Sequence, residues 1–147
     1  METFENTITI QRPAEQVFAY LANFENVPAW NYAIEKTSKS SPGPVGVGTT
    51  YRQLRSVPRR SQEGFQVTVF EPAARLAVEG QIGPFHATTS YLLEAIAGAT
   101  RLTNNVALEP SHAVLRPIAL LPVPKVKAAV AQNLAKLKQI LEADGPA

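Results

Sequence analysis

Polar side chains on otherwise apolar strand faces are the first candidates for chemistry in this sequence. Asn104 alternates with Leu102, Val106 and Leu108, so its amide is expected within an apolar lining. A buried amide needs hydrogen-bond partners, and a bound ligand is one such partner. Another side chain or an ordered water would also satisfy it, and the pattern leaves these alternatives open.

Three further polar or aromatic side chains could meet a ligand in the same way. Tyr51 and Gln53 share one face of an expected strand, and Tyr91 shares a face of another with Phe85. A tyrosine hydroxyl in a cavity can orient a carbonyl or a phenol, although a strand tyrosine more often packs its ring and keeps its tip in water. Asn133 interrupts the apolar side of the last expected helix. Its amide is expected either to face a cavity or, as the pattern slightly favours, to lie at a boundary position where it faces solvent or caps a neighbour.

The two histidines are the side chains best suited to act as a general base near neutral pH. His86 has the opposite strand parity to Phe85 and Tyr91, which predicts that it points outward. His112 lies at the start of the C-terminal helical region. Because neither has an obvious carboxylate partner in the sequence, both are expected on the surface, and no catalytic residue is assigned.

Metal and cofactor chemistry lacks its usual residues. The chain has no cysteine, two isolated histidines and a single aspartate, Asp144, so no cluster of metal ligands is expected. Gly43, Gly46 and Gly48 lie close together but lack the lysine and the serine or threonine of a phosphate-binding loop. The sequence therefore predicts no metal site and no cofactor, and the glycines are expected in a hairpin turn.

Charge and hydropathy narrow the range of partners. The formal net charge is +2 and the basic residues form no dense stripe, so a nucleic-acid partner is not expected. No stretch reaches the roughly 18 consecutive apolar residues of a membrane-spanning helix. The start of the chain lacks the pattern of a signal peptide, which predicts a cytoplasmic protein without stable membrane insertion.

The segment Ala113–Val123 is unusually apolar for a surface element. One interpretation is a lid that touches a ligand or, transiently, a membrane. The other, which the pattern favours, is a helix packed on the domain's own sheet or on a dimer partner. The sequence therefore leaves both a monomer and a homodimer open.

Backbone patterns place these side chains on one sheet and a few helices. Glu2–Gln11 alternates as a strand, and Pro13 is expected at the first position of a helix that a short second turn follows. Helical periodicity returns near the end, with a shorter helix over Ala113–Leu121 and a long amphipathic helix over Lys125–Ala143. Six strands separated by turn signals are expected between these helices: Tyr32–Ser38, Thr49–Val57, Gly64–Phe70, Arg75–Gln81, His86–Ala95 and Thr100–Glu109.

One apolar sheet face and one apolar helix stripe must cover each other, which predicts a single α+β domain over residues 1–147. A twisted sheet of this size curls, and a curved sheet leaves space beside a straight helix. The residues expected to line that space are Trp30, Tyr51, Gln53, Phe65, Val67, Tyr91, Asn104, Val106, Asn133 and Leu137. A register slip of one residue would exchange the faces and bring in Arg52, Arg55, Glu79 and Arg101 instead.

The order of these elements and several local motifs carry a resemblance to a known family. The motifs are RPAEQVFAYLANFENVPAW (Arg12–Trp30), VGVGTTY (Val45–Tyr51), VTVFEPAARLAV (Val67–Val78), GATRLTNNVAL (Gly98–Leu108) and NLAKLKQILE (Asn133–Glu142). Together they resemble the polyketide cyclase/dehydrase-like family of the START/Bet v 1-like (SRPBCC) superfamily. The resemblance covers nearly the whole chain and implies a helix-grip fold of six to seven antiparallel strands around the long helix. It also implies that Trp30, although expected to pack on the short helices, has a place at a pocket mouth.

Two functions follow from this resemblance, because the superfamily holds lipid carriers, plant ligand binders, aromatase/cyclases and ring-hydroxylating subunits. The first is binding of a small hydrophobic ligand, such as a polyketide, isoprenoid or lipid, in the cavity. The alternative is an aromatase/cyclase or dehydratase that folds a chain in the same cavity and gains rate from proximity. No acid–base pair can be placed there from the sequence, so binding is the favoured hypothesis.

Overall fold

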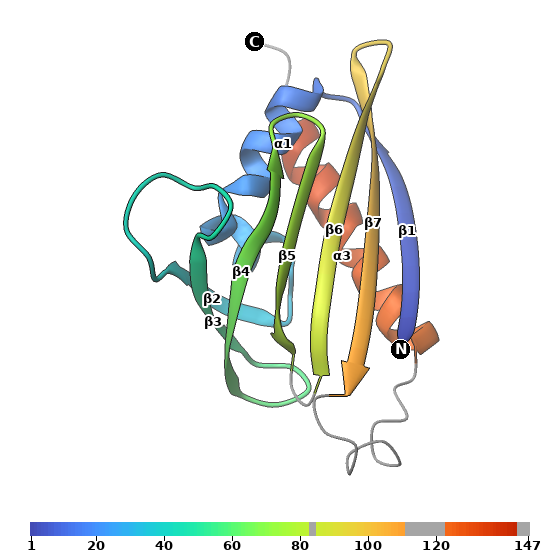
Figure 1. Ribbon diagram of the computed structural model, residues 1–147. Helices are drawn as coiled ribbons and strands as arrows, with labels where there is room; N and C mark the ends of the chain where they lie inside the picture. The colour runs from blue at the N-terminus through green and yellow to red at the C-terminus, as the bar shows by residue number, and fades with distance from the viewer. Residues whose placement is uncertain (83–84, 111–122, 144–147) are drawn as a thin grey trace.

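The computed structural model describes residues 1–82, 85–110 and 123–143, with the side chain of Pro110 left aside. A seven-stranded antiparallel sheet forms one layer and the helices form the other (Figure 1). The α+β helix-grip fold expected from the sequence is confirmed. The strands are β1 (Glu2–Ile10), β2 (Ile34–Lys39), β3 (Thr50–Arg55), β4 (Ser61–Glu71), β5 (Arg75–Ile82), β6 (Phe85–Ile96) and β7 (Ala99–Pro110). The helices are α1 (Ala14–Ala22), the 3-10 turn η1 (Phe24–Asn26), α2 (Val27–Trp30) and α3 (Val123–Ala143).

The sheet joins the two ends of the sequence. The spatial order is β1-β7-β6-β5-β4-β3-β2, so β2 to β7 form a meander and β1 is added to the edge of β7. The register of that last pair runs from Glu2 opposite Leu108 to Ile10 opposite Thr100. Figure 1 shows α3 crossing behind this edge of the sheet, and α3 packs chiefly against β1.

Burial follows the expected apolar stripes. Leu134, Leu137 and Leu141 of α3 are buried in the same core cluster as Leu102 of β7. Full burial of a leucine side chain stabilises a fold by about 1.5–3 kcal/mol. The helix and the sheet therefore cover each other, as the two amphipathic patterns require.

The boundaries of most elements differ from the expectation by one to three residues. Pro13 is the residue before α1, with an extended ψ of 150°, instead of its first helical residue. Tyr32 lies outside β2, because the side chain of Asn31 accepts a hydrogen bond from the N–H of Ala33 at 3.0 Å and forms a turn there. α3 begins at Val123, two residues before the expected start. His112 and the expected helix Ala113–Leu121 lie outside the described residues.

Gly80 of β5 lies where two backbones come unusually close. A β-carbon built on Gly80 would lie 2.7 Å from both Cα and Cβ of Phe65, and closer still to the carbonyl oxygen of Gly64. The pairing of β4 with β5 shifts register between Val67 and Val69, next to this contact. Such a bulge increases local twist, so this part of the sheet is curved and crowded.

The C-terminal part of α3 is attached to the end of β1 by a polar clamp. The carboxylate of Glu142 accepts hydrogen bonds from the backbone N–H of Gln11 at 2.7 Å and from Nζ of Lys138 at 2.6 Å. Lys138 also donates to the carbonyl of Thr9, and Arg12 donates to the carbonyl of Glu142. These bonds lower the pKa of Glu142, with the Lys138 hydrogen bond as the largest cause.

The clamp predicts a pH-dependent contribution to stability. Because folding lowers the pKa of Glu142, its contribution is present above the ordinary glutamate pKa and is lost as the pH falls through the folded-state pKa. We expect Glu142→Gln to reduce the free energy of unfolding by about 1 kcal/mol near pH 7, since the carboxylate is partly exposed. At an acid pH below the folded-state pKa, the variant should equal the native protein. Urea titrations at both pH values test this, with the exposed Glu5→Gln as control; a difference that persists in acid would contradict it.

Candidate functional site

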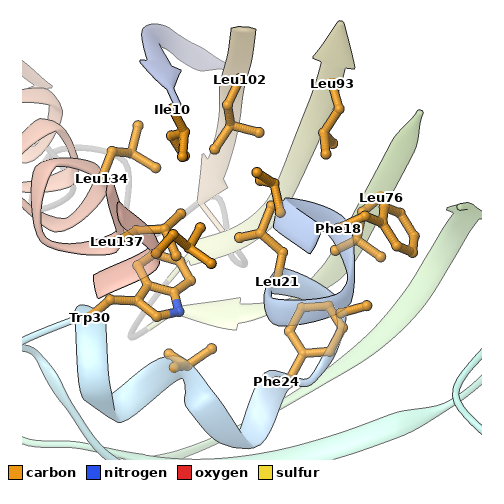
Figure 2. Packing of buried hydrophobic residues seen from close by; sticks show 14 of the residues in the cluster. Ile10, Phe18, Leu21, Phe24, Trp30, Leu76, Leu93, Leu102, Leu134 and Leu137 are labelled. Atoms are coloured by element: carbon orange, nitrogen blue, oxygen red, sulfur yellow. The ribbon is translucent and has the colours of Figure 1, made fainter. Parts of the chain in front are cut away.

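The residues expected to line a cavity all lie on the face of the sheet that α3 covers, or on the helices opposite it. The register places Tyr51 opposite Phe65 and Tyr91 opposite Asn104. Val67 belongs to the core cluster of Trp30 and Leu137, and Val106 to the adjoining cluster of Phe4 and Leu108. Figure 2 shows Trp30 beside Leu137, facing Leu21 and Phe24 across the interior. Whether these side chains contact a ligand remains a prediction.

Aromatic rings form one wall of this interior. Tyr51 and Phe65 are stacked with ring centroids 5.1 Å apart, and Phe24 packs edge-on against both, at 5.0 and 5.4 Å. Burial raises the pKa of Tyr51, and the charge of Glu25 raises it further. Such ring pairs add about 0.5–1.5 kcal/mol beyond the area they bury. Tyr51 therefore has a packing role in this wall.

Tyr91 lies deeper, on β6, one of the inner strands of the sheet. Burial raises the pKa of its phenol well above the ordinary value. The phenol is therefore protonated throughout the physiological range and can donate a hydrogen bond, but it is poorly suited to accept a proton as a base. Its side chain also keeps part of its surface accessible, despite this inner position.

The two asparagines are buried, and each side chain forms a hydrogen bond with the protein's own backbone. Nδ2 of Asn104 donates to the carbonyl of Ser90 at 3.2 Å, a backbone partner that the sequence did not suggest. Asn133 is buried instead of lying at a boundary near solvent. Its Oδ1 accepts a hydrogen bond from the backbone N–H of Tyr32 at 3.4 Å, so Asn133 links α3 to the segment that leads into β2.

A charged network that the sequence analysis missed lies on the same inner face. Glu63 of β4 accepts from Nε2 of Gln53 and from Nε of Arg55, each at 2.9 Å, and from Oγ of Ser61 at 3.3 Å. Only 2% of the Glu63 side chain and 14% of the Arg55 side chain are exposed. Strand alternation could have found Glu63, because it shares parity with Phe65.

The expectation for Arg55 was wrong. It was placed inside only if the register slipped, yet it shares parity with Tyr51 and Gln53 and faces inward without any slip. Its charge is accommodated there because its partner, Glu63, lies on the neighbouring strand. The other three residues of that alternative, Arg52, Glu79 and Arg101, are exposed.

The outer face of the sheet carries His86, Glu79 and an open hollow. His86 points outward as predicted, and its Nε2 lies 3.2 Å from Oε1 of Glu79 across β5 and β6. An open hollow of about 360 Å³ lies over Gly64, where the missing side chain leaves room. Its lining is both polar and apolar, and includes Thr50, Arg52 and Gln66 together with Tyr51 and Phe65.

Within the part of the chain that the structure describes, two buried polar atoms of the interior have no hydrogen-bond partner. They are Nε1 of Trp30 in α2 and Oγ1 of Thr37 in β2. Trp30 is 7% exposed and Thr37 is 5% exposed. Figure 2 shows the indole nitrogen of Trp30 directed away from its own helix, towards the middle of the core cluster. The register pairs Thr37 with Gln53, so the Thr37 hydroxyl lies beside the Glu63 network.

The described residues meet the requirements of neither a membrane-spanning helix nor a metal-binding cluster. None of the helices in that part of the chain is long and apolar enough to cross a membrane. The same residues hold no group of three or more histidine, aspartate or glutamate side chains placed to bind a metal ion.

Comparison of the fold with solved structures gives several close matches. A protein of Thermus thermophilus has a TM-score of 0.79 at 14% identity, with 99% of this chain and 100% of that chain covered. The Zhui aromatase/cyclase from a Streptomyces species has a TM-score of 0.77 at 14% identity, with 96% and 93% covered. A START superfamily protein from Mycobacterium smegmatis has a TM-score of 0.68 at 19% identity, with 97% and 95% covered. At these identities the likeness establishes a START/Bet v 1-like fold.

Comparison of the sequence points to the same family. An uncharacterized protein of Mycobacterium tuberculosis is 30% identical over 128 residues, with 78% of this chain and 74% of the relative covered. Residues 1–142 match the family described as polyketide cyclase / dehydrase and lipid transport. That match spans every described strand and nearly all of α3. The chain therefore belongs to the polyketide cyclase / dehydrase and lipid transport family.

Proposed function

We propose that the protein binds a small hydrophobic molecule between the inner face of the sheet and α3. The proposal rests on the accessible surface of three residues on the inner strands of the sheet. Val78, Thr89 and Tyr91 lie on β5 and β6, away from both sheet edges, and point to the covered face. All three nevertheless keep accessible surface. A solidly packed interior would leave none there, because protein cores are packed as densely as organic crystals.

The packing of the helices supports this position. α3 packs mainly on β1, at one edge of the sheet, and α1 touches β6 and β7. The side chains around the accessible positions are mostly apolar, including Val67, Leu76 and Val106. An apolar site with few polar groups suits a largely hydrophobic ligand. A polyketide, an isoprenoid or a lipid has that character, in keeping with the family's description.

Catalysis in the same space is the second candidate, and one of the similar structures is that of an aromatase/cyclase. Tyr91 and Asn104 are paired across β6 and β7 and could hold a carbonyl oxygen. However, the raised pKa of Tyr91 makes it a donor and a poor base. The histidine among the described residues, His86, lies on the outer face. We therefore propose binding as the function.

Filling the space should abolish binding without unfolding the protein. We expect Thr89→Phe to weaken binding of the neutral dye Nile red by about tenfold or more, because the ring would occupy the ligand's place. The melting temperature should change little, since unfilled space accepts the ring without strain. Thr88→Phe is the matched control: the same exchange, one residue away, on the outer face of β6. It should leave dye binding unchanged.

Fluorescence titration and thermal melts separate the outcomes. If the interior is filled by side chains, Thr89→Phe would overpack it, cost about 1–3 kcal/mol and lower the melting temperature by several degrees. That result, or unchanged dye binding in Thr89→Phe, would refute the proposal. Native mass spectrometry of the freshly purified protein provides a second test, because a co-purifying hydrophobic molecule should be present in the native protein and depleted in Thr89→Phe.

A further inference from the structure

Buried polar atoms without a hydrogen-bond partner indicate where a ligand presents its own polar atoms. A buried donor or acceptor without a partner costs about 1–3 kcal/mol, and buried side-chain polar atoms are mostly paired. Among the residues that the structure describes, Nε1 of Trp30 and Oγ1 of Thr37 find no such partner. They come from α2 and β2, which pack against each other at one side of the interior.

We propose that these two groups form a polar subsite that binds a neutral oxygen, a carbonyl or a hydroxyl, on an otherwise apolar ligand. This rests on the binding function proposed above and specifies the chemical class of the ligand. The indole N–H of Trp30 can only donate, so it requires an acceptor. The hydroxyl of Thr37 can donate or accept. A carbonyl oxygen satisfies two donors, and a hydroxyl accepts from Trp30 while donating to Thr37.

The charges nearby favour a neutral group over a carboxylate. The buried carboxylate of Glu63 lies two strands from Thr37, and Arg55 neutralises it. Gln53 and Ser61 also donate to Glu63. A ligand carboxylate at Thr37 would therefore find no free counter-charge in the Glu63 network, because Arg55 is already paired with Glu63. It would also lie close to a second carboxylate, that of Glu63. Burial of a carboxylate without its own counter-charge is strongly unfavourable, so a fatty-acid anion is not the ligand class.

The apolar wall sets the shape of the rest of the ligand. Trp30 belongs to the same core cluster as Phe24, Tyr51 and Leu137. In Figure 2 its indole nitrogen is directed towards the side on which Leu21 and Phe24 lie. A flat ring or a branched hydrocarbon would pack against these faces with its oxygen at the indole nitrogen. The subsite would thus fix which end of the ligand enters first.

Four naphthalene derivatives, substituted at the same ring position, test the subsite. Naphthol and acetylnaphthalene carry the neutral oxygen, methylnaphthalene has none, and naphthoate is charged. We expect the two neutral oxygen compounds to bind about 3- to 10-fold more tightly than methylnaphthalene, the range of one net hydrogen bond, and naphthoate to bind most weakly. Isothermal titration calorimetry on the native protein gives the dissociation constants.

Two conservative variants assign the effect to these atoms. Trp30→Phe and Thr37→Val should each weaken naphthol binding about 3- to 10-fold while binding of methylnaphthalene stays the same. Without ligand, Thr37→Val should be at least as stable as the native protein, because it removes an unpaired buried hydroxyl. Thr88→Val, on the outer face, is the matched control and should change nothing.

The outcomes distinguish the two proposals. If none of the four compounds binds, the proposed binding function itself fails. If methylnaphthalene binds as tightly as naphthol, or each variant weakens both equally, the polar subsite is refuted while binding stands. Tightest binding of naphthoate would also refute the neutral-oxygen class.

Discussion

Glu63→Ala should destabilise the protein by about 3–5 kcal/mol, the cost of removing one partner of a buried ion pair. The variant leaves the guanidinium of Arg55 on the inner face without its carboxylate, and it also removes the acceptor for Gln53 and Ser61. Small domains have only about 5–15 kcal/mol of stability in total. Urea denaturation monitored by circular dichroism should therefore show a large fall in the midpoint concentration.

A double variant separates the loss of the pair from the loss of packing. Replacing both charges, with Arg55→Met and Glu63→Leu, should recover most of the stability, because buried ion pairs are often no better than apolar residues of similar volume. Ser61→Ala, which removes only the longest bond at 3.3 Å, should cost less than about 1 kcal/mol. A Glu63→Ala variant within 1 kcal/mol of the native protein would show that water reaches the pair and screens it.

Gly80→Ala is expected to cost about 3 kcal/mol or more, at the upper end of overpacking effects. The added methyl group would meet the backbone of β4 at Gly64 and Phe65, and backbone cannot move aside as a flexible side chain can. Either β5 separates from β4 or the curvature of the sheet changes. The free energy of unfolding from urea titration measures the cost.

Gly64→Ala provides the control for that experiment. Its added methyl group would lie 3.7 Å from the carbonyl oxygen of Tyr51, an ordinary contact, over the hollow on the outer face. The exchange should be neutral or stabilise the protein by about 0.4–1 kcal/mol, through the reduced entropy of the unfolded chain. Equal losses at both positions would mean that glycine propensity, and not the close approach, decides the outcome at Gly80.

Strand alternation predicted the fold and the inner face well, for a physical reason. The side-chain period of a strand is two, so once Leu102 and Val106 are placed in the core, Asn104 must join them. The same logic placed Tyr91 opposite Asn104 on the covered face. One long amphipathic helix and one sheet have few ways to cover each other. These features depend on local pattern, which a single sequence displays directly.

The features that sequence reasoning missed depend on contacts between elements. Arg55 was placed inside only in the case of a register slip, and buried charges are rare unless paired. Strand parity could have placed Glu63 inside, but its ion pair with Arg55 becomes visible only when the register of β3 and β4 is known. Polar atoms of Thr37 and Trp30 without a partner among the described residues are likewise a result of how separate elements pack, here α2 and β2. Nothing in the residue types or spacing distinguishes them from satisfied neighbours.

The pairing of β1 with β7 has a consequence for synthesis on the ribosome. Glu2 and Leu108 are partners in the final sheet, so the first strand emerges long before its neighbour exists. During that interval an extended segment with Phe4, Ile8 and Ile10 on one side is open to pairing with other nascent chains. Three threonines and one glutamate on its other side, Thr3, Thr7, Thr9 and Glu5, keep that face hydrated during this interval. The amino-terminal strand can pair only after β7 has left the ribosome.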